Sequence, residues 1–502
     1  MPKILTFSSE WIAFLVFFGF ISLFIGFAEV IRKALRWSAE TTRKMVHVLV
    51  GILVSLAPFI ISDMRLVILL AVIFMIVNYL ALKSKAFEGM HATERVSYGT
   101  LYFPLAFALL VWIYWDRNPA ILLTSMLILA FADTMATVVG ERVPAERKFI
   151  LWSDPKSLAG STAFFVTAFA VVAIALPWFT LLMGAAPLGL GLILTIAGLT
   201  AFFAALTEAV SRQGSDNLTL TLAAAFMMDI TLALGREGLL LKLILFIILL
   251  GIGLYGMFRL HTLNKSGAVG AFILGSFLYG LAEWVLLVPV LVFFILSSAL
   301  SKLAERNKQP KSEQEKGSNR DIIQVYANAG IPLIMGLCWF LSGFEDPIWF
   351  YAFLGALAAA TADTWETEIG SFALRQPRHI LNFKQVPRGY SGGVTLMGTL
   401  GGFFGAFIIV WSGSWLYSDG IDLQMMLLIA LAGFLGSIVD SILGATIQGK
   451  FVCVVCGKHT EKHVHCGQAT THIAGWGKMD NDWVNMACTA SGAGFLLLFC
   501  LL

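Results

Sequence analysis

The sequence predicts an all-α polytopic membrane protein with about 16 transmembrane helices in two homologous, parallel-repeat halves and a small zinc-ribbon-like insert. The first observation is composition: 58% of the 502 residues are hydrophobic and 13% are charged, whereas soluble proteins have about 45–50% and about 25%. The second is that the apolar residues form blocks of about 20, the length of a membrane-spanning helix. This composition excludes a soluble enzyme, a disordered scaffold and a nucleic-acid binder. A transmembrane barrel would instead alternate polar and apolar residues with a period of two.

Sixteen apolar blocks are the predicted spans. They lie near residues 11–31, 46–62, 65–82, 98–115, 119–140, 158–177, 187–210, 218–235, 239–257, 266–283, 284–301, 322–341, 347–371, 393–411, 424–447 and 484–501. Glu283 divides one adjacent pair, and the glycines around it favour a broken or re-entrant helix there. No cleavable signal peptide is expected, because the first basic cluster follows the first apolar block instead of preceding it.

The third observation is the distribution of basic residues. In this arrangement 29 of the 34 lysines and arginines fall in alternate loops, and the other five fall on the opposite side. Cytoplasmic loops carry an excess of Lys and Arg, so we expect a bacterial inner-membrane type of protein with the basic loops in the cytoplasm. The charged stretch 302–321 is expected to be one of these loops.

Polar motifs recur at a nearly constant offset. Residues 132–140 and 362–370 share five of nine positions, including Asp133 and Asp363. Farther along, Ser157-x-x-Gly160-Ser161 corresponds to a similar motif at 395–399, and Glu208 corresponds to Asp440. This order predicts two membrane domains, 1–236 and 237–502, although glycine- and alanine-rich helices can also match by chance.

The acidic residues within spans are the candidate catalytic residues: Asp133, Glu208, Asp363 and Asp440. Intramembrane acids are costly and are functional candidates by default. Mg²⁺ prefers oxygen ligands and bridging phosphates, and we expect Asp133, Asp363 and Asp440 to bind it. The alternative is a structural salt bridge or a polar contact between helices.

Glycine- and serine-containing loops precede two helices, and helix N-termini bind phosphate. We expect nucleotide or phosphate contacts in the first half from Lys156, Ser157, Gly160 and Ser161, and in the second half from Arg388, Ser391, Gly392 and Gly393. Further first-half candidates are Arg43, Lys44, His47, Asp216 and Asn217. For Arg43 the alternative role is simple anchoring at the cytoplasmic face.

These motifs resemble known families. In the first half, Arg43-Lys44-x-x-His47, Ala132-Asp133-Thr134 and the Lys156 loop resemble the phytol kinase and dolichol kinase family; Pro144 departs from it, because relatives often have glycine there. The second half resembles the phytyl-phosphate kinase family in Ala362-Asp363-Thr364-Trp365-x-x-Glu368, the Arg388 loop, the Asp440 motif and Asn481-Asp482. The resemblance implies a fusion of two kinases and adds Glu368, Asn481 and Asp482 to the phosphate-binding candidates.

A Cys/His insert at 450–478 predicts a structural zinc site. Cys-x-x-Cys followed about ten residues later by a Cys/His cluster is typical of such sites, and a cytoplasmic position argues against a disulfide. The expected ligands are Cys453, Cys456, Cys466 and, as the fourth, His465. His459, His463 and His472 remain alternatives for the fourth ligand.

The predicted function is two-step phosphorylation of a long-chain isoprenoid alcohol, first to the monophosphate and then to the diphosphate. The resemblance implies CTP or another nucleoside triphosphate as donor. It also implies phytol, farnesol or geranylgeraniol as substrate, in isoprenoid salvage for tocopherol and quinone biosynthesis. The alternatives are a membrane cytidylyltransferase and a transporter with a repeated core. Substrate would come from the bilayer and nucleotide from the cytoplasm; no nucleic-acid partner is expected, and an oligomer is compatible with the sequence.

The span count predicts that both sites face the same side. Asp133 ends the fifth predicted span and Asp363 ends the thirteenth, and an even separation of eight spans returns the chain to the same face. Single cysteines placed at Lys148 and Gln376 should therefore both react with a membrane-impermeant maleimide from the cytoplasmic side only. Labelling of the two positions from opposite faces would contradict the span count and the repeat together.

Overall fold

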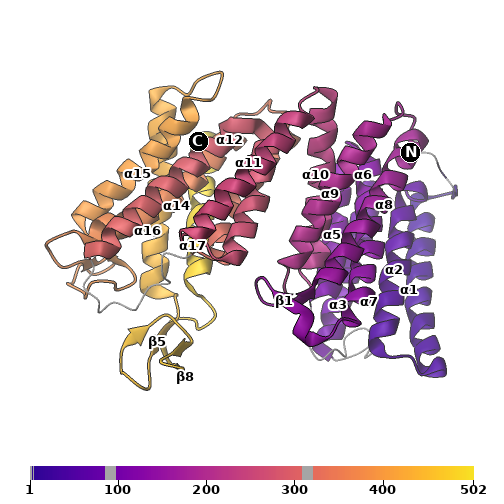
Figure 1. Cartoon of the computed structure of the whole chain (residues 1–502), viewed down its shortest axis with the longest axis horizontal. Coiled ribbons are helices and arrows are strands. Elements are labelled where there is room, and N and C mark those ends of the chain that lie inside the picture. Colours follow the sequence, from indigo (N-terminus) through magenta and orange to yellow (C-terminus); the bar gives the residue numbers. More distant parts are fainter. Residues whose placement is uncertain (1–2, 4, 85–97, 308–319) are drawn as a thin grey trace. The chain divides into compact units, whose positions relative to one another are not determined.

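The structure is a computed structural model that describes residues 3, 5–84, 98–307 and 320–502 (Figure 1). The chain forms two compact units, Met1–Leu241 (unit 1) and Lys242–Leu502 (unit 2). This boundary lies a few residues after the predicted one at 236/237. Most of the predicted cytoplasmic stretch 302–321 lies outside the described residues.

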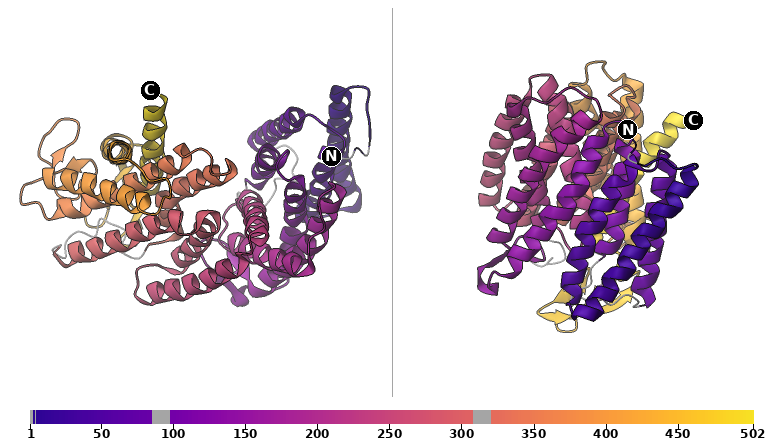
Figure 2. Two further views of the ribbon diagram at one scale, coloured as in Figure 1. Left: turned by 90° about the horizontal axis from the view of Figure 1, so that it is seen from above. Right: turned by 90° about the vertical axis from the view of Figure 1, so that its right-hand side faces the viewer.

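Unit 1 is a helical bundle with one short β-hairpin, and its helices run roughly along one direction (Figure 2, right). Its elements are α1 (Glu10–Leu35), α2 (Ala39–Leu56), η1 (Ala57–Phe59), α3 (Met64–Ser84), α5 (Gly99–Tyr114), α6 (Pro119–Ile128), the π-helix η2 (Leu129–Asp133), α7 (Thr134–Glu141), η3 (Ala145–Arg147), β1 (Lys148–Ile150), β2 (Pro155–Ser157), α8 (Leu158–Leu182), α9 (Leu190–Ala209) and α10 (Asp216–Arg236).

Unit 2 is a second bundle, from which a small β-rich insert extends beyond the ends of α16 and α17 (Figure 1). Its elements are α11 (Leu240–Arg259), α12 (Lys265–Asn307), α13 (Ile322–Leu341), α14 (Ile348–Ser371), β3 (Arg378–His379), β4 (Gly393–Val394), α15 (Leu396–Ser414), α16 (Leu423–Thr446), β5 (Lys450–Val452), β6 (His459–Thr460), β7 (Val464–His465), β8 (Gln468–Ala469), β9 (Thr471–Ala474) and α17 (Asn481–Leu501).

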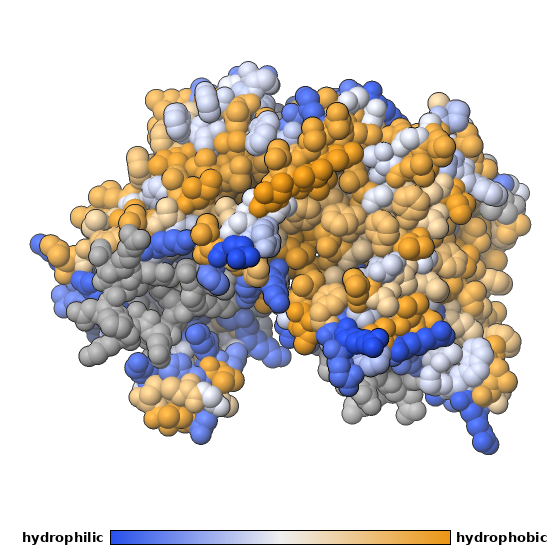
Figure 3. All heavy atoms as spheres, viewed as in Figure 1, coloured by the Kyte–Doolittle hydropathy of each residue, from blue (hydrophilic) through white to orange (hydrophobic). Residues whose placement is uncertain are grey.

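The predicted membrane-spanning class is confirmed. Within the described residues, 13 helices are long and apolar enough to cross a membrane, and apolar side chains cover their visible faces (Figure 3). All 16 predicted ranges fall on helices. The difference in number arises because α5 has only 16 residues, α14 is not among these 13 helices, and α12 contains two predicted spans in one assigned helix.

Helix α12 breaks at the predicted position. Ala282 and Glu283 have non-helical backbone angles, and Glu283 has φ 47°. The backbone carbonyl of Arg320 lies against Gly267, while its guanidinium lies 5.6 Å from the ring centroid of Phe293. In a continuous helix, residues 267 and 293 would be about 39 Å apart at about 1.5 Å per residue. One arginine contacts both arms, so the chain must turn back at the break, as two separate spans require.

The acid-bearing helix is the most enclosed element of unit 2. Between Phe350 and Ala362 every side chain of α14 except that of Tyr351 is buried, and α13, α15, α16 and α17 pack around it. Small residues permit this close packing: a Cβ added at Gly436 would lie 2.7 Å from the Cβ of Ala359. In unit 1 the equivalent segment α6–η2–α7 packs against α2, α8 and α10. Close packing of this kind is typical of membrane helices, whose association depends on small residues.

A hairpin and a capped helix follow the acid-bearing helix in unit 1. Strands β1 and β2 pair antiparallel, and the Ser157 hydroxyl at the N-cap of α8 accepts a hydrogen bond of 3.1 Å from the Gly160 amide. Gly160 has no room for a side chain, because an added Cβ would lie 2.9 Å from the carbonyl oxygen of Ala136 and 3.2 Å from the Cα of Gly140. The glycine pair thus brings α7 and α8 into backbone contact.

Unit 2 has the same local structure. Strands β3 and β4 pair antiparallel, and Thr395 at the N-cap of α15 accepts a hydrogen bond of 3.0 Å from the Gly398 amide. A Cβ at Gly398 would lie 2.5 Å from the Glu366 carbonyl oxygen and 3.2 Å from the Cα of Gly370. These positions match the motifs on which the predicted repeat was based; the duplication itself remains a prediction of the sequence.

This contact yields a stability prediction. Gly398→Ala should lower the free energy of unfolding by about 1–3 kcal/mol, because a methyl group is forced into a closely packed interface. Gly494→Ala in α17 is the matched control: nothing lies within 4 Å of its added Cβ, and alanine is the better helix former. Thermal unfolding in detergent measures both. If Gly398→Ala is as stable as Gly494→Ala, the close contact between α14 and α15 is wrong.

Candidate functional site

One cavity in unit 1 collects every site residue predicted for the first half. The cavity has a volume of about 770 Å³. The eleven predicted residues that line it are Arg43, Lys44, His47, Asp133, Lys156, Ser157, Gly160, Ser161, Glu208, Asp216 and Asn217. They come from α2, η2, the β2–α8 junction, α9 and α10, so residues up to 174 positions apart in the sequence, Arg43 and Asn217, meet at one place.

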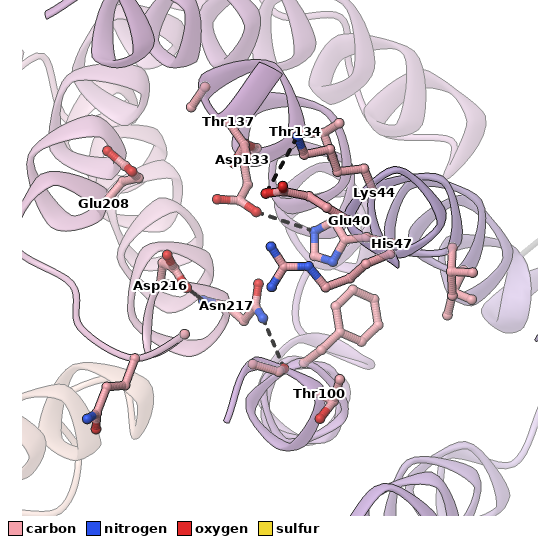
Figure 4. A pocket seen from close by; sticks show the side chains of 18 of the residues that line it. Glu40, Lys44, His47, Thr100, Asp133, Thr134, Thr137, Glu208, Asp216 and Asn217 are labelled. Carbon is pink, nitrogen blue, oxygen red and sulfur yellow. Dashed lines mark hydrogen bonds and ion pairs between the residues drawn. The ribbon is translucent and has the colours of Figure 1, made fainter. Parts of the chain in front are cut away.

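Asp133 lies at the centre of the polar end of the cavity. It is the last residue of the π-helix η2, and π-turns within α-helices are frequent at functional sites. Its side chain and that of Asp216 point into the same space (Figure 4). Oδ2 of Asp133 lies 3.8 Å from Nε2 of His47, and that nitrogen also lies 3.1 Å from the Leu129 carbonyl oxygen. His47 is therefore held against the turn that presents Asp133.

Lys156 is paired with a second acid. Its ammonium group donates a hydrogen bond to Glu208, whose side chain is only 7% exposed. Burial alone would lower the pKa of Lys156, but the carboxylates of Glu208 and Asp216 raise this pKa above its ordinary value. The lysine therefore stays cationic throughout the physiological pH range. A permanent positive charge beside Asp133 and Asp216 balances part of the negative charge of the cluster.

The two loop serines have different surroundings. Ser157 uses its hydroxyl oxygen to cap α8. The buried hydroxyl of Ser161, one turn farther along, has no hydrogen-bond partner within the described residues and lines the cavity. A buried hydroxyl normally finds a partner. Ser161 is therefore available to bind a ligand, as the sequence predicts.

The other end of the cavity is apolar. It is lined by side chains of four membrane helices, α1, α2, α3 and α5: Ile21, Ile25, Val46, Val50, Val54, Leu70, Ala71, Phe74, Phe103, Pro104 and Phe107. Chemically, this end suits an alkyl or isoprenoid chain. The cavity therefore offers charged groups at one end and a hydrocarbon surface at the other.

Sequence reasoning missed several acids around this cavity. Lys44 Nζ lies 2.5 Å from Glu141 Oε2 and 3.9 Å from Glu40 Oε1, and Asp154 accepts a hydrogen bond of 3.3 Å from the amide of Gln213. The i,i+4 spacing of Glu40 and Lys44 was a readable signal for that pair. No local pattern connects Lys44 with Glu141, because their proximity arises only when α2 packs against α7.

In unit 2, Asp363 and Asp440 meet. Their carboxyl groups lie close enough for their charges to interact, where α14 packs against α16. A third acid, Glu366, was missed. It is 8% exposed, and its carboxylate accepts hydrogen bonds of 3.4 Å from Thr399 and from Ser437. Its position three residues after Asp363, on the same helix face, was the signal that identifies it.

Arg388 and Glu368, two of the predicted phosphate contacts in unit 2, bind groups of the helical bundle itself. The Arg388 guanidinium donates hydrogen bonds to backbone carbonyls that follow α14, the shortest to Ala373 at 2.6 Å. Glu368 accepts a hydrogen bond of 2.7 Å from Ser301 of α12. In this structure Arg388 therefore fixes the loop after α14, and Glu368 joins two helices. Neither lies in the Asp363–Asp440 contact.

The remaining predicted residues of unit 2 lie in the loop before α15 and at the start of α17. Gly392 has φ +84° and packs so closely on α16 that an added Cβ would lie 2.5 Å from the Cβ of Ala445. Gly393 forms β4. Asn481 begins α17, and Asp482 is buried in its first turn. Ser391 donates a hydrogen bond to Glu461 of the Cys/His insert.

The insert brings the four predicted zinc ligands together. One ligand atom each from Cys453, Cys456, His465 and Cys466 lies within 4.8 Å of all the others. A backbone hydrogen bond from Cys456 is the largest influence on the Cys453 thiol and lowers its pKa to about 6, so this sulfur is readily available as thiolate. Tetrahedral sites of three cysteines and one histidine are typical of structural zinc.

Backbone geometry explains how adjacent residues can both face this centre. Cys466 has φ 51°, a left-handed conformation that turns its side chain back beside His465. Of the alternative fourth ligands, His463 and His472 pack against the Phe451 ring, with centroids 4.5 and 5.2 Å away. The side chain of His459 lies outside the described part of the structure. The geometry therefore favours His465.

Comparison with known proteins identifies the family of this chain. Residues 246–493 match the family described as integral membrane protein DUF92. The chain is 31% identical over 268 residues to Protein PGR of Arabidopsis thaliana, a match that spans 49% of this chain and 91% of PGR. The chain belongs to the DUF92 family.

This DUF92 protein is similar to two further named proteins. It is 27% identical over 221 residues to the phytol kinase of Synechocystis sp., covering 43% of this chain and 90% of that protein. It is 29% identical over 201 residues to the chloroplastic protein VTE6 of Arabidopsis thaliana, covering 38% and 57% respectively. No solved structure gives a significant match. The family match includes Asp363, Asp440 and the Cys/His insert but none of the residues that line the unit 1 cavity.

The ligand geometry of this family member predicts its metal content. Purified protein should contain about one zinc per chain by elemental analysis, and Cys453→Ser should lose it, since each structural zinc needs all four ligands. Cys500→Ser, at the exposed end of α17, is the control and should retain the metal. Metal-free wild-type protein would contradict the site.

Proposed function

We propose that this protein phosphorylates a long-chain isoprenoid alcohol twice, first in unit 1 and then in unit 2, with a nucleoside triphosphate, CTP by family resemblance, as donor. The observation that carries the proposal is the cavity of unit 1. All eleven predicted residues line its charged end, and apolar side chains of four membrane helices line the other. An amphiphilic alcohol is matched at both ends by this arrangement. The name of the phytol kinase relative supports phytol as the substrate.

The first step needs positioning and charge neutralisation more than covalent chemistry. The apolar end holds the hydrocarbon chain and brings its hydroxyl to Asp133. The hydroxyl oxygen attacks the γ-phosphorus of the nucleotide, the bond to the bridging oxygen breaks, and the nucleoside diphosphate leaves. Asp133 accepts the hydroxyl proton, with His47 fixing its turn. Lys156, Arg43 and Ser161 bind phosphate oxygens.

A divalent cation fits the chemistry of both sites. Asp133 lies close enough to Asp216 and Glu208 for their charges to interact, and the same holds for Asp363 and Asp440. Carboxylate oxygens are the ligands that Mg²⁺ prefers. Asp133 with Asp216 would hold it in unit 1 and Asp363 with Asp440 in unit 2, where it would neutralise phosphate charge.

The second step has the same form, with the monophosphate as acceptor. The three acids of unit 2 have different surroundings from those of unit 1: Glu366 is held by hydroxyl groups, and the Asp363–Asp440 contact has no counterpart of the Lys156–Glu208 pair within the described residues. A site rich in carboxylates suits a substrate that brings a phosphate and its cation. Both sites are proposed to face the cytoplasm, where nucleotide is available.

Two variants separate the steps. Asp133→Asn should reduce alcohol phosphorylation at least about 100-fold, the usual loss when a proton acceptor is removed, while supplied monophosphate is still converted. Asp363→Asn should instead accumulate monophosphate. The assay uses purified protein, CTP and labelled phytol, with mono- and diphosphate resolved by chromatography.

Asp419→Asn, in an exposed loop, is the control and should retain both steps. Loss of both steps in either folded site variant would contradict the two-site proposal. Release of pyrophosphate in place of nucleoside diphosphate would favour a cytidylyltransferase, and absence of any nucleotide turnover would favour a transporter.

A further inference from the structure

The Cys/His insert contacts the loop of the second site through two consecutive loop residues. Glu461 accepts a hydrogen bond from the Ser391 hydroxyl. Lys450, the first residue of β5, lies 3.2 Å from the Tyr390 hydroxyl through its Nζ and 4.3 Å from the centroid of the Tyr390 ring. Two hydrogen bonds, one of them to a carboxylate, and one cation–π contact thus join the loop to the insert.

The base of the insert is fixed to the bundle. Gln448 is 2% exposed, and the Gly449 amide donates a hydrogen bond of 2.9 Å to the Met479 carbonyl. A Cβ at Gly475 would lie 2.1 Å from the Gln448 carbonyl oxygen, so the two ends of the insert are in backbone contact. Because its base is fixed to the bundle, the insert has a defined position relative to the 387–393 loop.

Glu461 is placed by the part of the insert that carries the predicted metal ligands. It follows β6 directly, and β6 pairs with β5 through Phe451 and Thr460. The turn that joins these strands begins at Cys453, whose amide donates to the Lys458 carbonyl. The ligand cluster therefore closes the hairpin that presents Glu461.

The same contact reaches the acids of the site. Glu461 lies close enough to Asp440 for their charges to interact. Ser391 lies against α16, with its Cβ 3.4 Å from the position of a Cβ at Gly444, one helical turn after Asp440. Unit 1 has no counterpart: only seven residues separate Glu208 from Asp216, too few for such an insert.

We propose that Glu461 is a positioning residue for the second phosphorylation, through which the metal-ligating insert holds the 387–393 loop against the Asp363–Asp440 site. The inference rests on the proposed function. The loop is then ordered to receive a phosphate monoester head group, and the second step alone depends on the insert. Removal of the insert's metal releases Glu461 and, with it, the loop.

The test uses the full chain, with phytol and phytyl monophosphate supplied in separate assays. Glu461→Ala should lower kcat/KM for diphosphate formation about tenfold, the effect of losing one hydrogen bond to a charged group. Alcohol phosphorylation by unit 1 of the same molecule should be unchanged. Glu461→Gln keeps an oxygen acceptor for Ser391. Its kcat/KM for diphosphate formation should therefore lie between those of Glu461→Ala and wild type. Lys458→Ala, an exposed neighbour on the insert, should behave as wild type.

Two further measurements distinguish positioning from general structural loss. Hydrogen exchange of residues 387–393 should be faster in Glu461→Ala, and also in wild type stripped of zinc by a chelator, than in untreated wild type. Ser391→Ala combined with Glu461→Ala should lose no more second-step activity than Glu461→Ala alone, because the two side chains act through one contact.

The outcomes separate the two proposals. Wild-type protein that makes no diphosphate would overturn the proposed function, and the exchange of residues 387–393 would still decide the contact. Full second-step activity with unchanged exchange in Glu461→Ala would overturn the inference, and so would equal loss of both steps.

Discussion

The cost of placing carboxylates inside a membrane-spanning bundle is the constraint on which the rest of this structure depends. A charged side chain at the centre of a bilayer costs at least about 2.5–3.5 kcal/mol. Asp133, Asp363 and Asp440 must therefore face the interior of their bundles. The helices that carry Asp133 and Asp363 are accordingly the enclosed ones, packed on several sides by other helices of the same unit.

Enclosure requires close approach of helices, and small residues provide it. In unit 2 the glycines at 398, 433 and 436 leave no space for a side chain against α14. In unit 1 Gly51 lies against Ala130 and Gly160 against Ala136 in the same way. The glycines that face the acid-bearing helix are therefore a packing requirement. Gly392, in the loop before α15, has a positive φ of +84° as well, which gives a conformational reason for glycine.

The two units solve the same electrostatic problem differently. Unit 1 balances its acids with Lys156 and holds them beside an apolar cavity suited to a neutral alcohol. In unit 2 hydroxyl groups bind Glu366, the three acids lie close to one another, and a carboxylate from a separate insert approaches them. This asymmetry is consistent with two successive acceptors, the first uncharged and the second already carrying a phosphate.

The sequence by itself determined the membrane class, the apolar segments that form the long helices, the break at Glu283, and eleven of the residues that line the unit 1 cavity. It could do so because hydropathy, basic-loop asymmetry and rare intramembrane acids are local signals. Only the tertiary structure showed that Lys44 pairs with Glu141, that Arg388 binds backbone carbonyls, and that Glu461 reaches Ser391. Each of these contacts joins elements whose spacing in the sequence carries no information about their distance, because helix packing and the fold of the insert, and no local pattern, bring them together.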